Sequence, residues 1–128
     1  MKKILCLAIL FITTISCQAQ QKEGAELVNP TEFEQKIESG KGQLVDVRMA
    51  REFKEGHIEG AKNIHIYDND FEQQIDKLDK DETVYVYCKA GSRSAEAVEI
   101  MQRKGFKHII ELDGGIDAWL EEGKPVKN

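Results

Sequence analysis

The chain has 128 residues, a length that favours a single domain. Its formal net charge is −5, and its 18 basic and 23 acidic residues are interspersed along the sequence. This pattern indicates a solvated surface and argues against a nucleic-acid-binding protein, which usually carries a basic face.

The N-terminal segment has the layout of an export signal. Lys2 and Lys3 precede a mostly apolar run over residues 4–15, and small or polar residues follow it. A basic start, about a dozen apolar residues and a small-residue exit are typical of a secretory signal peptide. The apolar run is too short to span a membrane comfortably.

Two cleavage sites are compatible with this signal. Ser16-Cys17 resembles a bacterial lipoprotein signal, in which Cys17 is lipidated and becomes the new N-terminus, although Leu is usual where Thr14 stands. Cleavage after Ala19 would instead release a soluble protein. We expect residues 1–17 (alternatively 1–19) to be the signal peptide, residues 18–25 a tether and residues 26–126 the folded domain. The domain would then lie in the periplasm or be anchored to a membrane of a bacterial cell envelope.

The cysteine count isolates one thiol in the exported domain. Cys6 leaves with the signal peptide, and Cys17 is either lipidated or removed, so Cys88 is the only thiol left and has no disulfide partner. Exported proteins usually pair their cysteines, and an odd thiol there indicates either a reactive group or an inert core residue.

Strand and helix patterns alternate along the rest of the chain. Phe71, Ile75 and Leu78, for example, recur at helical spacing. This alternation predicts an α/β fold, a parallel sheet with helices on both faces, and places ligands beyond the carboxyl ends of the strands. Strands are expected over 44–48, 63–66, 83–87 and 107–112. Helices are expected from Pro30 (capped by Asn29) to Gly40, over 50–54, from a cap at Asp68 through Leu78, after the loop as far as Gly105, and over 116–122.

Cys88 falls directly after the strand expected over 83–87. The sequence Cys88-Lys89-Ala90-Gly91-Ser92-Arg93-Ser94 then runs through a short loop into a helix. Such a loop can turn its N–H groups inward, the helix start adds unpaired donors and a positive dipole end, and Arg93 and Lys89 add positive charge. These features favour a thiolate, the nucleophilic form of cysteine, or another bound anion. The alternative is a simple strand–turn–helix connection with a passive cysteine and solvated surface charges.

Three stretches in this order resemble the rhodanese (thiosulfate sulfurtransferase) domain family. The loop at residues 88–94 is similar to the family's active-site loop. Residues 44–48 and 52–64 are similar to its N-terminal signature, and Leu112-Asp113-Gly114-Gly115-Ile116-Asp117-Ala118-Trp119 to its C-terminal one. The resemblance covers about residues 25–126 and implies a five-stranded parallel sheet flanked by helices.

The resemblance implies a sulfurtransferase. Cys88 would take a sulfane sulfur from a donor such as thiosulfate, hold it as a persulfide and pass it to a thiol or other nucleophile. Arg93 would orient the loop and help to hold the anion, while Asp46 and Arg48 would brace the scaffold. The persulfide-binding loop would comprise Lys89, Ala90, Gly91, Ser92 and Ser94. No cofactor is implied, and the three scattered His residues and one thiol do not have the spacing of a metal site.

Loop length bears on the choice between related activities. Four residues separate Cys88 from Arg93. Relatives that act on phosphate or arsenate have a loop one residue longer and a wider cradle, so the shorter loop favours sulfur transfer over phosphatase or arsenate reductase activity. A sulfur carrier or partner-binding module with little turnover is the other alternative.

Overall fold

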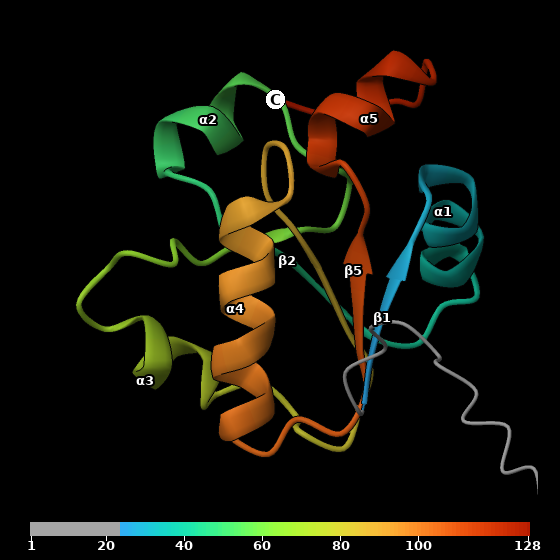
Figure 1. Cartoon of the computed structure of the whole chain (residues 1–128). Helices are drawn as coiled ribbons and strands as arrows, with labels where there is room; N and C mark the ends of the chain where they lie inside the picture. The colour runs from blue at the N-terminus through green and yellow to red at the C-terminus, as the bar shows by residue number, and fades with distance from the viewer. Residues whose placement is uncertain (1–23) are drawn as a thin grey trace, which may run out of the picture.

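The computed structural model describes residues 24–128 and contains a five-stranded parallel sheet with helices on both faces (Figure 1). The strands lie in the order β1-β5-β4-β2-β3, so β4 is central. They are β1 (Ala25–Val28), β2 (Gln43–Asp46), β3 (Lys62–Asn63), β4 (Val84–Tyr87) and β5 (Ile109–Leu112). The predicted α/β fold and five-stranded sheet are confirmed. The expected signal peptide and Cys17 lie outside the described residues.

Four helices connect these strands, and a fifth follows β5: α1 (Pro30–Glu38), α2 (Ala50–Glu55), α3 (Phe71–Ile75), α4 (Ser92–Arg103) and α5 (Gly115–Glu121). Asn29 caps α1 as predicted, because its side-chain oxygen accepts the Glu32 N–H at 2.8 Å. Within the described residues no helix is both long and apolar enough to cross a membrane.

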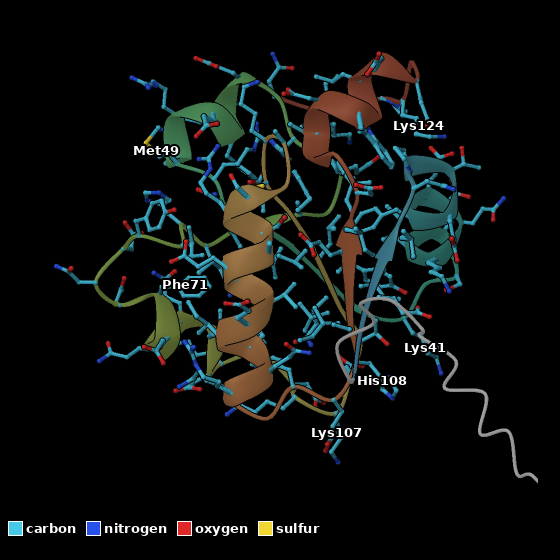
Figure 2. All side chains as sticks on the ribbon, viewed as in Figure 1. Lys41, Met49, Phe71, Lys107, His108 and Lys124 are labelled. Atoms are coloured by element: carbon cyan, nitrogen blue, oxygen red, sulfur yellow. The ribbon has the colours of Figure 1, made fainter. Side chains whose placement is uncertain are left out.

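Strand β4 supplies both hydrophobic cores through the alternation of its side chains. Val84 and Val86 face the core formed with α3 and α4, which Figure 2 shows filled by side chains including Phe71. Tyr85 and Tyr87 face the opposite core, which also contains the buried Trp119 of α5. Successive side chains of a strand point to opposite faces, so this fully buried strand is apolar throughout and carries the chain from the centre of the sheet to Cys88.

Two sequence predictions of elements are corrected. Strand β1 was not expected, and it includes Ala25, which the prediction placed in the tether. It is a four-residue edge strand in which Glu26 and Leu27 are exposed. It therefore lacks the apolar run that marks a buried strand. The helix expected from Asp68 to Leu78 is limited to α3. The Asp68 carbonyl accepts the Phe71 N–H in a turn, and Leu78 reaches the core from a second turn.

Candidate active site

The carboxyl ends of β2 and β4 bring the predicted site residues together. Cys88 follows β4 and is 1% exposed, with its Sγ facing the loop that leads into α4. The Gly91 N–H donates to Cys88 Sγ at 3.0 Å. Gly91 has a positive φ of 121° and open space where a β-carbon would stand, so its lack of a side chain serves the turn of the backbone. The loop therefore presents at least one backbone donor to the sulfur.

The N-terminal turn of α5 holds the other side of this loop. The Ile116 N–H donates to the Cys88 carbonyl at 2.9 Å, and the Asp117 N–H donates to the Lys89 carbonyl at 3.0 Å. A β-carbon on Gly115 would fall 2.6 Å from the Cys88 carbonyl oxygen and would also collide with the Lys89 carbonyl. A residue with a side chain could not approach the loop backbone as closely as Gly115 does, and the start of α5 binds these two carbonyls.

Behind the sulfur lies a chain of polar contacts. The buried Ser94 Oγ is 3.4 Å from Cys88 Sγ and 2.7 Å from Glu111 Oε2 on β5. The same hydroxyl lies 3.1 Å from the Gly91 carbonyl oxygen. A carboxylate therefore stands one hydroxyl away from the thiol.

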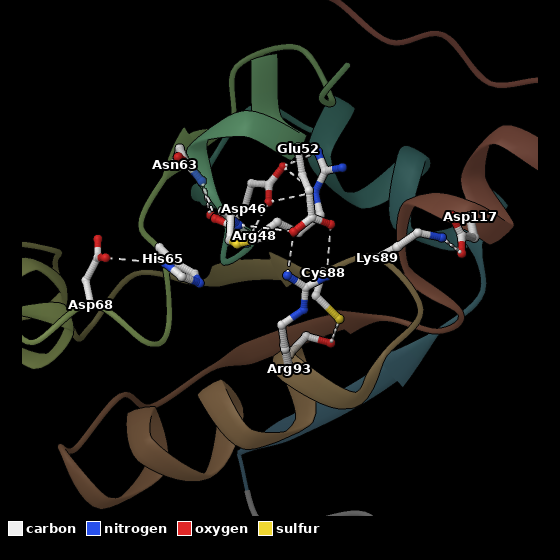
Figure 3. Close-up of polar contacts among 12 residues, drawn as sticks. Asp46, Arg48, Glu52, Asn63, His65, Asp68, Cys88, Lys89, Arg93 and Asp117 are labelled. Atoms are coloured by element: carbon white, nitrogen blue, oxygen red, sulfur yellow. Dashed lines mark hydrogen bonds and ion pairs between the residues drawn. The ribbon is translucent and has the colours of Figure 1, made fainter. Parts of the chain in front are cut away.

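Arg93 makes a two-pronged ion pair with Glu52 of α2 (Figure 3). Its two terminal nitrogens donate to the two carboxylate oxygens at 2.7 and 3.0 Å. This hydrogen bonding lowers the pKa of Glu52 and raises the pKa of Arg93. The second cation of the loop is also paired, since Lys89 Nζ contacts Asp117 Oδ2 of α5 at 2.7 Å. Ion pairs thus join the loop and the start of α4 to α2 and α5.

Asp46 and Arg48 form a buried pair beside the loop, as Figure 3 shows. Arg48 donates through Nε and Nη2 to the Asp46 carboxylate and through Nη2 to the Gly56 carbonyl at 2.7 Å. The hydroxyl of Tyr87 accepts the Ile58 N–H at 3.0 Å, and burial raises the pKa of this tyrosine. These contacts tie the segment after α2 to the ends of β2 and β4.

A hollow of about 210 Å³ opens beside the loop. Arg48 and Glu52 line one side of it, and Lys89, Asp117 and the exposed Leu120 line the other. A second hollow, about 340 Å³, lies between α1 and the 58–60 segment and includes none of the predicted site residues. Of these two hollows, the one of about 210 Å³ is the one that belongs to the candidate site, because it borders Lys89, the residue next to Cys88.

The structure thus brings every predicted site residue except Cys17, which is not described, to one end of the sheet. Sequence reasoning missed three further residues there: Glu52, Glu111 and Gly115. Glu52 and Gly115 belong to the stretches that carry the family resemblance, but nothing in the sequence paired Glu52 with Arg93. Glu111 gave no signal, because only the parallel pairing of β4 with β5 places it near Ser94. In residues 24–128, no group of three or more His, Cys, Asp or Glu side chains could hold a metal ion.

Comparison with known proteins assigns the family. Residues 29–122 match the Rhodanese-like domain, and the chain belongs to this family. The fold agrees, since a rhodanese-related protein from Thermoplasma volcanium superposes with a TM-score of 0.71 at 32% identity, over 80% of this chain and 97% of that one.

Three curated relatives connect the family to sulfur chemistry. The chain is 34% identical to "Thiosulfate sulfurtransferase GlpE" of Shewanella oneidensis, over 68% of this chain and 84% of GlpE. It is 34% identical to "Probable adenylyltransferase/sulfurtransferase MoeZ" of Mycobacterium tuberculosis, over 90% of this chain but only 30% of MoeZ. It is 32% identical to "Putative sulfur carrier protein YrkF" of Bacillus subtilis, over 68% of this chain and 46% of YrkF.

Proposed function

We propose that this protein is a sulfurtransferase that moves a sulfane sulfur from a small donor such as thiosulfate to a thiol acceptor through a persulfide on Cys88. Cys88 Sγ attacks the outer sulfur of thiosulfate, the S–S bond of the donor breaks, and sulfite leaves with the bonding electrons. The acceptor thiolate then attacks the outer persulfide sulfur, and Cys88 leaves as a thiolate.

The observation that carries this proposal is the loop around Cys88. The Gly91 N–H points at Sγ, while the Cys88 and Lys89 carbonyls are bound by the start of α5. A loop that turns donors toward its centre and carbonyls outward suits an anion such as a thiolate or a persulfide. In this proposal the N–H groups of residues 89–94 hold the persulfide, and Arg93, fixed by Glu52, keeps the start of α4 in place beside it.

Steady-state turnover tests the proposal. With thiosulfate as donor and a small thiol as acceptor, the wild-type protein should release sulfite and pass the sulfur on in repeated cycles. Cys88→Ser should abolish turnover, whereas Cys17→Ser should retain it, because the proposed reaction uses Cys88 alone. Absence of turnover with every sulfane donor and thiol acceptor tried would contradict the proposal.

A sulfur carrier with little turnover is the second candidate, favoured by the pairing of the site's cations. Lys89 and Arg93 each contact a carboxylate, which reduces their attraction for a small free anion. A carrier would accept sulfur from a partner protein and deliver it once. Transfer of one sulfur per chain in a single turnover, without sustained cycling, would favour this reading. Cys88-dependent hydrolysis of an aryl phosphate would instead revive the phosphatase alternative.

We also propose that the domain is exported and held to a membrane by a lipid on Cys17. The support is the sequence of residues 1–20 alone, and the sulfur donor and acceptor would then lie in the cell envelope. The wild-type protein should sediment with membranes, and Cys17→Ser should not. A soluble wild-type protein with an N-terminus at Gln20 would favour cleavage after Ala19.

A further inference from the structure

The hydrogen bonds around the Ser94 hydroxyl, behind Cys88, can be assigned donors and acceptors from the number of protons available. The Ser94 hydroxyl has one proton and lies within hydrogen-bond distance of the Glu111 carboxylate at 2.7 Å and the Gly91 carbonyl at 3.1 Å. Both of these groups can only accept, taking Glu111 in its ionised form. The proton of Ser94 is therefore committed away from the sulfur, and the carboxylate is the stronger acceptor because its bond is charge-assisted and shorter.

Cys88 Sγ consequently faces a lone pair of the Ser94 oxygen at 3.4 Å. A protonated thiol donates to that lone pair, whereas a thiolate in the same position would be repelled by it. The Gly91 N–H at 3.0 Å has the opposite preference, because it stabilises the thiolate. The sulfur thus lies between one group that favours the anion and one that favours the thiol.

We propose that Glu111, acting through Ser94, is a positioning residue that disfavours the thiolate form of Cys88 and so restrains its reactivity. Among the described residues, Arg93 of α4, which is held by Glu52 of α2, and Tyr67 from the segment after β3, whose hydroxyl donates to Glu96 of α4, also interact electrostatically with the thiol. Arg93 opposes the effect of Glu111. Ser94 transmits that effect because its own proton is given to the carboxylate.

The consequence for sulfur transfer rests on the proposed function. A thiol attacks a sulfane sulfur only as its thiolate, so favouring the thiol slows sulfur uptake. Cys88 also leaves as a thiolate when an acceptor removes the sulfur, and a less stable thiolate leaves more slowly. Glu111 would therefore slow both half-reactions and lengthen the lifetime of the persulfide. A long-lived persulfide is the behaviour of a sulfur carrier.

The test measures alkylation of Cys88, which does not require sulfurtransferase activity. Iodoacetamide is applied to the full chain at pH values from about 5.5 to about 9.5. This range extends on both sides of the pKa of a free thiol, about 8.5. The reaction is followed on the tryptic peptide over residues 81–89, which holds Cys88 as its only cysteine. Glu111→Gln keeps the side chain's size and removes its charge. Glu26→Gln is the matched control, because Glu26 lies exposed on β1, the strand that pairs with β5.

Glu111→Gln should alkylate several-fold faster than wild type at pH 7, with the midpoint of its pH profile moved to lower pH, because Ser94 can then donate to the sulfur. Glu26→Gln should match wild type. In a Ser94→Ala background, Glu111→Gln should add little, since its effect passes through Ser94. A Glu111→Gln variant that alkylates at the wild-type rate or more slowly would overturn the proposal.

Ser94→Ala keeps the proposal falsifiable if Glu111→Gln does not fold. Its alkylation at pH 7 should equal or exceed that of wild type, because the lone pair that repels the thiolate is gone. Slower alkylation would show that the hydroxyl donates to the thiolate and would overturn the proposal. Absence of thiosulfate turnover in the wild-type protein would count against the proposed function, whereas the alkylation rates alone decide the role of Glu111.

Discussion

At the scale of single residues, Glu52 has the clearest unexpected role. Its carboxylate accepts hydrogen bonds from both terminal nitrogens of Arg93. Both side chains are largely buried, with 16% of Glu52 and 19% of Arg93 exposed. The pair connects α2 to the start of α4, directly after the Cys88 loop. Arg93 is therefore fixed in place and is less available to bind a substrate anion than its sequence position suggested.

Removing the Glu52 charge should destabilise the protein in a pH-dependent way. Because the contact with Arg93 lowers the pKa of folded Glu52, its stabilisation is present above the unfolded value of about 4.3 and is lost as pH falls through the lower folded pKa. Glu52→Gln should cost roughly 1–3 kcal/mol of unfolding free energy at pH 7. That cost should shrink at acidic pH, as measured by urea denaturation.

The control for this experiment is Glu59→Gln. Glu59 also makes a 2.7 Å contact, with Lys127, but both side chains are well exposed, at 73% and 60%. Exposed pairs contribute little, so this variant should lose no more than about 1 kcal/mol. Equal losses in the two variants would mean that burial of the Arg93–Glu52 pair has no special importance.

At the scale of elements, the start of α5 determines the shape of the Cys88 loop. Two of its N–H groups bind the Cys88 and Lys89 carbonyls, and this requires Gly115 to pass against the loop backbone. The second glycine of the C-terminal signature thus has a structural role. Gly115 allows contact with the loop, and its positive φ of 62° is a conformation that other residues rarely adopt.

Gly115→Ala should therefore disrupt the loop as well as destabilise the domain. The β-carbon meets backbone carbonyls that cannot move without shifting Cys88, so the variant should form little persulfide and lose at least roughly 1–3 kcal/mol of stability. Gly123→Ala is the matched control. Gly123 follows α5 with a similar φ of 75°, but nothing lies within 4 Å of its added β-carbon. Persulfide formation by Gly123→Ala should stay normal, and an equal loss in both variants would argue against contact of Gly115 with the loop.

The elements also show what the sequence could predict. Buried strands and capped helices were predictable because local signals mark them, such as the apolar run of β4 and the Asn29 cap. The edge strand β1 had no such signal, since its two central residues are exposed and its pairing with β5 joins distant parts of the chain. The same limit applies to Glu52 and Glu111, whose partners lie 41 and 17 residues away.

At the scale of the whole molecule, the candidate site lies at one end of the sheet, and a hydrophobic core covers each of its two faces. The two cores on either side of β4 fix the position of Cys88, and α2, α4 and α5 close around it at the carboxyl ends of the strands. The arrangement fits the rule that ligands of parallel sheets bind at that end. It also leaves the thiol nearly inaccessible, because only 1% of Cys88 is exposed.

The central claim is that Cys88 carries sulfur, and intact-mass analysis tests it most directly. After treatment with thiosulfate, the intact wild-type protein should gain about 32 Da, one sulfur atom, and a thiol reductant should remove it. Cys88→Ser should gain nothing. No gain in the wild-type protein with any sulfane donor, or a gain that persists in Cys88→Ser, would contradict the account.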